Sequence, residues 1–349
     1  MFRVDKRGQT PFDTFYRIPA RAALRDDSPA VMIRAEGPDP SPQAYANGAT
    51  AMVSVEADPT TASETERAIL ADVRARFEAT ENPRLRQLIL GLIDHLHAFV
   101  REQKLTWSEW EYFMGFLARA AAVTKDGRNE FIALSDSIGI SMQVLAASQP
   151  KPPGATIPTL IGPFFIDDAP MFPIGADISS GASGQPLYAH GRVLDTEGKP
   201  VIDAILNVWQ SDDRGLYDVQ DNFDPEKMWG RGRIACDAEG RYAFWSVMPT
   251  AYPAPMDAAL GDLIRNTTGK YWRPAHLHFA IETKTADSLV THIFTRGSEH
   301  IDCDVAFGVR PALIMDFTEH GPGVAPDGRE MNGPYRTLNY NFVLTRSAC

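Results

Sequence analysis

The sequence contains few cysteines and no long apolar run. Its 349 residues include only three cysteines, Cys236, Cys303 and Cys349, which lie far apart without Cys-x-x-Cys spacing. This pattern excludes a disulfide framework and a zinc ribbon, and it is typical of proteins in a reducing cytoplasm. No apolar run reaches the roughly 20 residues of a membrane span, and the N-terminal sequence lacks the pattern of a signal peptide. We therefore expect a cytoplasmic protein with no membrane partner.

Basic residues are also scarce relative to acidic ones. The chain has 34 Lys and Arg against 45 Asp and Glu, which gives a formal net charge of -11. Such a field repels nucleic acid and anionic membranes, so neither is expected as a partner. Because 44% of the residues are hydrophobic, a chain of this length can form a full core and divide into two folding units.

The first 150 residues divide into two predicted parts. Residues 1–58 are rich in Pro, Ala, Asp and Arg and show no periodicity, so we expect a flexible N-terminal arm. Residues 59–150 contain apolar positions at helical intervals, beginning where Ser63 and Glu66 have the spacing of a capping box. The last of these segments, 131–147, is predicted to form one apolar helix. Residues 59–150 therefore predict a helical domain.

Residues 151–349 have a different pattern, in which short runs of β-branched and aromatic residues alternate with turns. The predicted strands are 187–193, 204–210, 241–247, 276–281, 289–294 and 312–317. Regularly spaced short strands are typical of an antiparallel β-sandwich. The predicted fold is therefore mixed but mainly β, with a β-sandwich domain preceded by an α-helical one.

One predicted strand carries two histidines. His276 and His278 are separated by one residue, so on an extended strand both imidazoles point to the same face, while Leu277 and Phe279 point into a core. Two imidazoles side by side provide half of a metal site. Taken alone, this pattern is more often structural than metal-binding.

Two tyrosines lie where predicted strands give way to loops. Tyr217 follows the strand 204–210, and Tyr252 follows the strand 241–247 in a proline-containing loop. Sites are often built at such edges. A packed ring with a solvated hydroxyl is the alternative for each tyrosine.

Together these features resemble the intradiol ring-cleavage dioxygenases. The resemblance runs from residue 63 to residue 317 and is carried by Gly215-Leu216-Tyr217, Pro249-Thr250-Ala251-Tyr252 and Arg273-Pro274-Ala275-His276-Leu277-His278. Within that family the chain is most similar to the hydroxyquinol 1,2-dioxygenases, on the segments Leu134-Ser135-Asp136, Ile161-Gly162-Pro163-Phe164 and Val290-Thr291-His292-Ile293-Phe294. The resemblance implies that the sandwich, residues 151–349, is catalytic and that the helical domain forms a homodimer.

The resemblance also implies one ferric ion per subunit, bound by Tyr217, Tyr252, His276 and His278. Phenolates are hard anionic donors that favour ferric iron, and two neutral imidazoles complete such a site. The pKa of a phenol, near 10, falls when its oxygen binds a trivalent cation. A tetrahedral zinc hydrolase would more naturally use carboxylates or thiolates in place of the phenols, so iron is favoured over zinc.

The implied reaction is cleavage of an aromatic diol or triol by dioxygen between vicinal hydroxyls. Tyr252 is expected to accept a substrate proton and Arg273 to stabilise the developing negative charge. Hydroxyquinol (benzene-1,2,4-triol) would give maleylacetate. The alternatives are a catechol 1,2-dioxygenase that gives cis,cis-muconate and a metal-free, non-catalytic sandwich protein. For Arg273 itself, a surface ion pair is the alternative.

The resemblance further implies a set of residues that contact the substrate: Ala133, Asp136, Leu160, Ile161, Gly162, Pro163, Ala254, Pro255, Arg273, His292 and Ala306. Asp136 is expected to accept a hydrogen bond from the third hydroxyl of a triol, with an ordinary surface charge as the alternative. His292 stands where catechol-specific relatives carry an amide, and a hydrogen-bonded core histidine is its alternative. The three alanines replace larger aliphatic residues, so we expect a pocket that admits a substituted ring.

Overall fold

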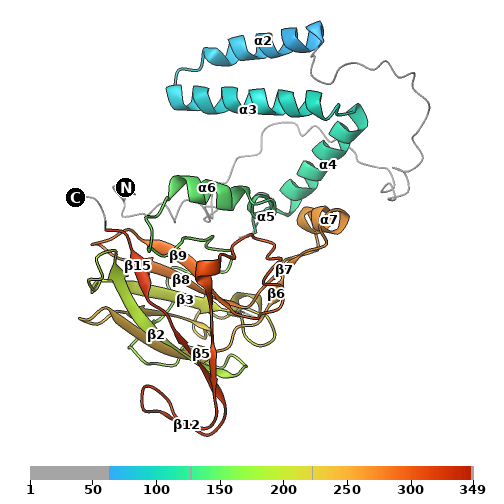
Figure 1. Ribbon diagram of the computed structural model, residues 1–349. Helices are drawn as coiled ribbons and strands as arrows, with labels where there is room; N and C mark the ends of the chain where they lie inside the picture. Colours follow the sequence, from blue (N-terminus) through green and yellow to red (C-terminus); the bar gives the residue numbers. More distant parts are fainter. Residues whose placement is uncertain (1–62, 126–127, 222, 347–349) are drawn as a thin grey trace. The chain divides into compact units, whose positions relative to one another are not determined.

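The computed structural model describes residues 63–125, 128–221 and 223–346 (Figure 1). The predicted arm, residues 1–58, lies outside the described residues. Within the described part, residues 63–116 belong to one compact unit and residues 117–346 to another. Helix α4, Trp107–Val123, crosses the boundary between the two units. The predicted domain boundary at residue 150 stays a prediction.

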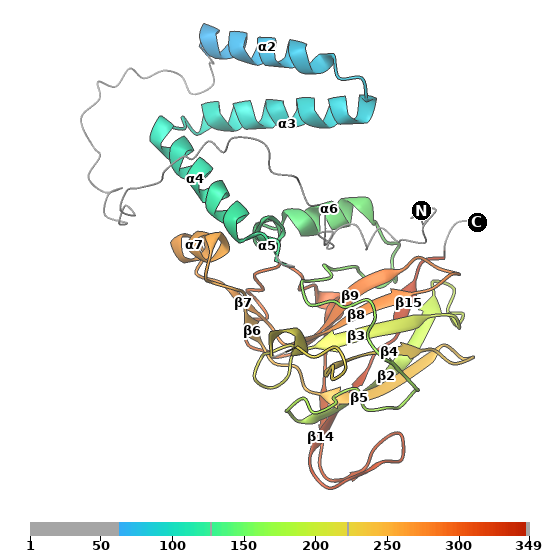
Figure 2. The same cartoon turned by 180° about the vertical axis from the view of Figure 1, so that it is seen from behind.

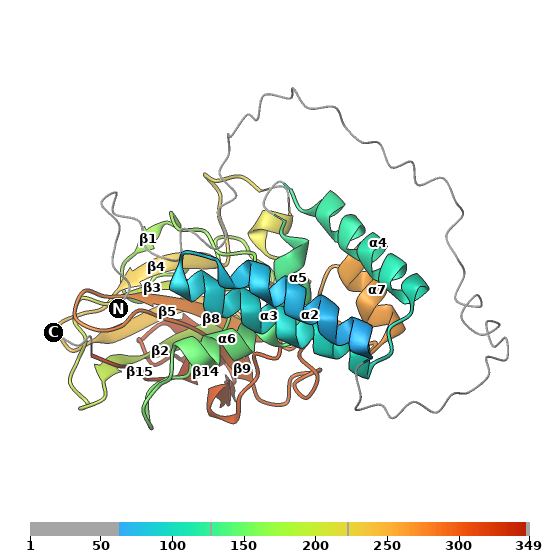
Figure 3. The same ribbon diagram turned by 90° about the horizontal axis from the view of Figure 1, so that it is seen from above.

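The first unit contains helices α2, Glu64–Glu78, and α3, Pro83–Glu102, which run side by side (Figures 1 and 3). The predicted capping box begins α2: Ser63 accepts a hydrogen bond from the backbone N–H of Glu66, and the Glu66 carboxylate accepts one from the backbone of Ser63. Between the helices, Arg74 donates to the carboxylate of Asp94. The predicted capping box is therefore present, and an ion pair links the two helices.

An apolar face of α3 is exposed. Leu85, Leu88, Leu92 and Leu96 recur at helical intervals, and each is 53–55% exposed. A helix that shows such a stripe normally buries it against another surface.

The second unit contains three short helices: α5, Glu130–Ser137, α6, Ile140–Ser148, and α7, Ala259–Asn266. The prediction of one helix over 131–147 was wrong, because Gly139 adopts a left-handed conformation with φ 75° and ends α5. No helix among the described residues is by itself long and apolar enough to cross a membrane. By length and composition α5 and α6 meet that criterion only as a pair, and this pair is bent by 80°.

The second unit also contains two larger β-sheets. The strands of the six-stranded sheet are, in spatial order, β1 (Met171–Phe172), β4 (Arg231–Ala235), β3 (Ile205–Gln210), β8 (His276–Glu282), β9 (Leu289–Thr295) and β10 (Ile314–Met315). The second sheet contains β11 (Thr318–His320), β14 (Tyr335–Asn339), β2 (Pro186–Asp195) and β15 (Phe342–Leu344), with β5 (Arg241–Val247) paired to β2. Two small ribbons are β6 (Tyr252–Pro253) with β7 (Trp272–Arg273), and β12 (Gly323–Val324) with β13 (Glu330–Met331). Single 3-10 turns lie at Asp218–Gln220 (η2) and Pro311–Leu313 (η3).

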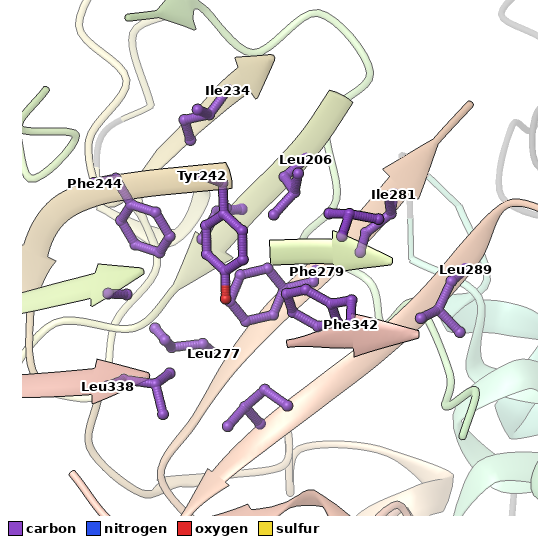
Figure 4. Close-up of a cluster of buried hydrophobic side chains, with 14 of the residues drawn as sticks. Leu206, Ile234, Tyr242, Phe244, Leu277, Phe279, Ile281, Leu289, Leu338 and Phe342 are labelled. Atoms are coloured by element: carbon purple, nitrogen blue, oxygen red, sulfur yellow. The ribbon is translucent and has the colours of Figure 1, made fainter. Parts of the chain in front are cut away.

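The predicted mixed, mainly β fold is confirmed, and five predicted strands correspond to β2, β3, β5, β8 and β9. The sixth, 312–317, is mostly wrong, because Pro311 begins the 3-10 turn η3 and only two residues remain in β10. The remaining strands, of which β4 and β14 are the longest, were not predicted. The main core lies between the two sheets, where Leu277 and Phe279 of β8 pack with Tyr242 and Phe342 (Figure 4).

The side-chain alternation of β8 divides its residues between two environments. Leu277, Phe279 and Ile281 belong to the main core, whereas His276 and His278 point to the opposite face of the six-stranded sheet. There β8 lies between β3 and β9 (Figure 2). The two histidines therefore occupy the centre of the sheet, on the face turned away from the sandwich core.

Candidate metal centre

Both histidines of β8 are buried and held by their neighbours. Each is 1% exposed. Trp209 lies opposite His278 on β3, and the two rings stack with centroids 4.6 Å apart. His276 contacts the carbonyl oxygen of Pro274 through Nδ1 at 2.6 Å. Since a carbonyl can only accept, Nδ1 carries the proton, and Nε2 of His276 presents a lone pair.

Tyr217 reaches the histidines from the loop after β3. The loop turns at Asp212, whose carboxylate accepts the backbone N–H groups of Arg214 and Leu216. The ring of Tyr217 is fully buried against Phe164, with centroids 4.5 Å apart. Its hydroxyl lies 2.9 Å from Nε2 of His278.

Tyr252 and Arg273 face each other across the small ribbon of β6 and β7, where they are register partners. Tyr252 is 5% exposed, and its hydroxyl lies 3.3 Å from the hydroxyl of Tyr217. The ribbon thus brings one phenol and one guanidinium to the two imidazoles.

Four predicted ligand atoms therefore converge. The Nε2 atoms of His276 and His278 lie 3.0 Å apart. Nε2 of His278 lies 2.9 Å from the hydroxyl of Tyr217. That hydroxyl lies 3.3 Å from the hydroxyl of Tyr252. Nitrogen and oxygen ligands bind small transition-metal ions at about 2.0–2.2 Å, so two ligands at about a right angle lie about 3 Å apart. The spacing of these donors fits one metal ion between them.

The environment favours neutral imidazoles. Burial lowers the pKa of His276 to about 3, with a further contribution from the positive charge of Arg273. Burial and neighbouring positive charge also hold the pKa of His278 well below its ordinary value. Burial, and then the neighbouring Tyr252, raise the pKa of Tyr217 well above 10. Imidazoles are thus ready to donate lone pairs, whereas the phenol of Tyr217 ionises only beside a strong cation.

His292 lies directly across from His278, on β9. It is fully buried, and its two ring nitrogens both face protein atoms: Nε2 lies 2.8 Å from Nδ1 of His278, and Nδ1 lies 3.0 Å from the hydroxyl of Thr159. His276, His278 and His292 form a cluster of potential metal ligands within 4.8 Å. Because His292 approaches the Nδ1 side of His278, it lies behind that ligand rather than beside the four converging atoms.

Sequence reasoning missed two residues of this site, Asp304 and Thr159. Asp304 accepts hydrogen bonds from Arg273 (Nε to Oδ1, 3.1 Å) and from the backbone N–H groups of Ala306 and Gly308. Burial raises the pKa of this carboxylate, but Arg273, together with His276 and the backbone N–H of Ala306, lowers it, and the net shift is downward. Arg273 is therefore in a buried ion pair, not a surface one. Neither residue has a spacing in the sequence that links it to the histidines.

The other predicted substrate residues surround this cluster to different degrees. Ile161 packs in one buried cluster with Tyr217 and Tyr252. A Cβ atom on Gly162, where φ is +77°, would lie 3.3 Å from Cε1 of His278. Leu160 and Pro163 flank these two residues, and Pro163 is exposed.

The three alanines and Pro255 lie near the same elements. Ala254 and Pro255 follow β6, which ends at Pro253, and Pro255 is exposed. Ala306 donates its backbone N–H to Asp304, and Ala133 lies on α5, three residues before Asp136. Contact of these side chains with a substrate stays a prediction.

Asp136, on α5, is mostly buried, and its Oδ1 atom has no hydrogen-bond partner within the described structure. Burial raises its pKa to about 6, partly offset by Ser141 and by the charge of Arg273. Asp136 is thus a buried acceptor close enough to Arg273 to feel its charge, rather than an ordinary surface charge.

Comparison with known proteins connects this geometry to a family. Residues 160–346 match the family described as Dioxygenase, and residues 82–156 match the one described as Catechol dioxygenase N terminus. The hydroxyquinol 1,2-dioxygenase of Nocardioides simplex is 42% identical over 280 residues, which cover 80% of this chain and 95% of the relative. The 6-chlorohydroxyquinol 1,2-dioxygenase of Cupriavidus pinatubonensis is 42% identical over 272 residues, 78% of this chain and 94% of that enzyme.

The fold matches as well. The crystal structure of hydroxyquinol 1,2-dioxygenase from Pseudomonas putida DLL-E4 superimposes with a TM-score of 0.74 at 37% identity, and covers 81% of this chain and 99% of its own. The family uses non-haem iron, and the histidine and tyrosine cluster described above is consistent with a metal site. The resemblance noted from the sequence is confirmed: the chain belongs to the intradiol ring-cleavage dioxygenases and is similar to the hydroxyquinol 1,2-dioxygenases.

Proposed function

We propose that the protein binds one ferric ion per subunit through Tyr217, Tyr252, His276 and His278 and cleaves hydroxyquinol, or a substituted relative, to a maleylacetate-type product. The observation that carries this proposal is the convergence of two phenol oxygens and two Nε2 atoms at spacings of 2.9–3.3 Å. When bound, ferric iron supplies Lewis acidity, which favours the deprotonated diol and draws electron density from its ring.

The protein's own residues handle protons and charge. Tyr252 lies on the short ribbon at the edge of the cluster, where its phenolate can accept a proton from a substrate hydroxyl. Arg273, held by Asp304, presents a fixed positive charge next to the cluster, and negative charge that develops on the substrate oxygens is stabilised there. The buried walls around Tyr217 and His278 exclude water from the reacting ring.

Asp136 supports a triol as the substrate. Its unpartnered buried oxygen can accept a hydrogen bond from a third hydroxyl, which catechol lacks. A hydrogen bond to a charged group contributes about 1.5–3 kcal/mol. Asp136→Leu should therefore lower kcat/KM for hydroxyquinol about 10–100-fold and leave catechol turnover nearly unchanged, while Asp136→Asn, which keeps an acceptor, falls between. Equal losses for both substrates would contradict this role.

The decisive experiment is anaerobic titration of the iron-loaded protein with hydroxyquinol, catechol and substituted catechols, followed by admission of oxygen. Tyrosinate ligands predict a visible charge-transfer band that shifts when a diol binds. The ultraviolet spectrum of the product distinguishes maleylacetate from cis,cis-muconate. It therefore decides between hydroxyquinol and catechol as the substrate. A pure protein that stays colourless after incubation with ferric iron would favour the non-catalytic alternative. Turnover of hydroxyquinol far above that of every substituted analogue would contradict the enlarged pocket.

We also propose that the helical domain, predicted over residues 59–150, forms a homodimer contact and that the protein acts in the cytoplasm. The exposed leucines of α3 support the first part, since they lie in the segment that matches the N-terminal family region. Sedimentation equilibrium should show a dimer that Leu88→Lys combined with Leu92→Lys converts to a monomer. Two exposed positions on α2, Arg67→Ala and Glu78→Ala, serve as controls. A monomeric wild-type protein would refute the dimer.

A further inference from the structure

His278 has a feature that His276 lacks: the partner of its second nitrogen is ambiguous. His276 donates Nδ1–H to a carbonyl oxygen, which can only accept. The Nδ1 atom of His278 faces Nε2 of His292, and an imidazole nitrogen either donates or accepts. On the Nδ1 side of His278, the direction of the hydrogen bond therefore depends on what His292 contacts on its other side.

That contact is the hydroxyl of Thr159, 3.0 Å from Nδ1 of His292. All three residues are buried, with His278 at 1%, His292 at 0% and Thr159 at 2% exposure. The backbone N–H of Thr159 donates to the carbonyl of Val290, which fixes Thr159 beside β9. Thr159, His292 and His278 thus form a continuous hydrogen-bonded row, which we call the histidine relay, and it ends at the Nε2 atom that faces the other donors.

The relay has two possible proton arrangements. In the first, His278 donates Nδ1–H to His292, and His292 donates Nδ1–H to the hydroxyl of Thr159, so Nε2 of His278 carries a lone pair. In the second, Thr159 donates to His292 and His292 donates to His278, so Nε2 of His278 carries a proton. A protonated nitrogen cannot bind a metal ion, so only the first arrangement is compatible with a metal ligand.

We propose that Thr159 and His292 are positioning residues that hold His278 in its metal-binding tautomer, with Thr159 as the terminal acceptor. The inference rests on the proposed metal site and deepens it. It also gives His292 a function that does not require contact with substrate, since both of its nitrogens are used within the protein. Partners of this kind change metal affinity by about 10–100-fold when removed.

Ferric ion affinity, measured by competition with citrate, tests the relay. His292→Phe removes the acceptor and should weaken iron binding about 10–100-fold, whereas His292→Gln, whose amide oxygen can accept, should restore most of the affinity. Without the hydrogen bond from its Nδ1–H, His278 gives less electron density to the iron through Nε2. The tyrosinate-to-iron band should therefore move to longer wavelength in His292→Phe. Affinity and band position are read without turnover.

A substitution at His292 also changes packing, so Thr159 provides the milder test. Thr159→Val is close in volume, keeps the imidazole, and should weaken iron binding about tenfold, while Thr159→Ser should not. The matched control is Thr291→Val: Thr291 is equally buried and next to His292, but its hydroxyl donates to the carbonyl of Ile157, outside the relay. This control should change iron affinity less than twofold.

The outcomes separate the two proposals. A wild-type protein that binds no ferric ion overturns both the metal site and the relay. A wild-type protein that binds iron, with His292→Phe or Thr159→Val no weaker than Thr291→Val, overturns the relay alone. The expected order of affinity is wild type, then Thr159→Val, then His292→Phe.

Discussion

The buried ion pair of Arg273 and Asp304 predicts a large loss of stability in Asp304→Asn. Both residues are buried, at 7% and 6% exposure, and Nε lies 3.1 Å from Oδ1. At an effective dielectric constant of about 20, two unit charges at this distance attract by about 5 kcal/mol. Removal of one member of a buried pair typically costs about 3–5 kcal/mol, because the remaining charge is left buried without a partner. Asp304→Asn should therefore lower the free energy of unfolding by about 3–5 kcal/mol.

Urea unfolding, followed by tryptophan fluorescence, to which the buried Trp209 and Trp245 contribute, measures this loss. With a slope of about 2–3 kcal/mol/M, the midpoint should fall by about 1–2.5 M. The matched control is Asp316→Asn, because Asp316 pairs with Arg296 at 2.7 Å but the two side chains are 72% and 57% exposed. An exposed pair contributes about 0–1 kcal/mol.

Losses of stability in Asp304→Asn and Asp316→Asn that agree to within about 1 kcal/mol would refute a large contribution of the buried ion pair. The pH dependence of stability provides a second test. The pKa of Asp304 is lowered in the folded protein, so as pH falls the unfolded chain takes up this proton first. The advantage of wild type over Asp304→Asn should be complete above about pH 4 and shrink below it. Because Asp304 contacts Arg273 and not the converging donors, kcat should fall in the variant while the iron band stays in place.

Three further predictions concern the metal cluster. Gly162 and Gly198 have φ values of +77° and +78°, so Gly162→Ala and Gly198→Ala should each lower the free energy of unfolding by about 1–2 kcal/mol. Only Gly162→Ala should also weaken iron binding, because a Cβ atom there meets His278, whereas the space at Gly198 is open. Equal iron affinities of the two variants would contradict this contact. Tyr217→Phe should remove one phenolate donor and reduce the visible band by about half, measured at full iron occupancy; an unchanged band would exclude Tyr217 as a ligand. Metal-free protein should lose stability as pH falls below about 6.5. Burial lowers the pKa of His276 to about 3, so the unfolded chain binds this proton first. Urea midpoints that are equal at pH 7.5 and pH 5 would argue against a buried neutral His276.

The sequence predicted the arrangement of the histidines because strand geometry alone determines it. Alternation on one strand sends His276 and His278 to one face and Leu277 and Phe279 to the other, whatever surrounds the strand. The phenols were different: nothing in the local pattern brings Tyr217 to within 2.9 Å of His278, and only the family resemblance suggested it.

The features that sequence reasoning missed depend on contacts between distant segments. Asp304 approaches Arg273 across 31 positions, and Thr159 approaches His292 across 133, so no spacing rule connects them. The break between α5 and α6 has a local cause, since Gly139 adopts a positive φ, but a glycine inside an apolar periodic segment is also compatible with a continuous helix.

The high pKa of the Tyr217 phenol has a consequence for how the centre is loaded. Without a cation beside it this oxygen holds its proton, and successive donors of the site lie 2.9–3.3 Å apart. Each phenol that becomes a ligand must therefore release a hydrogen ion to the solvent as the metal enters. If both phenols do so, uptake is coupled to the release of two hydrogen ions, and the apparent association constant rises about a hundredfold for each unit of increasing pH. Acidic conditions would then favour release of the ion.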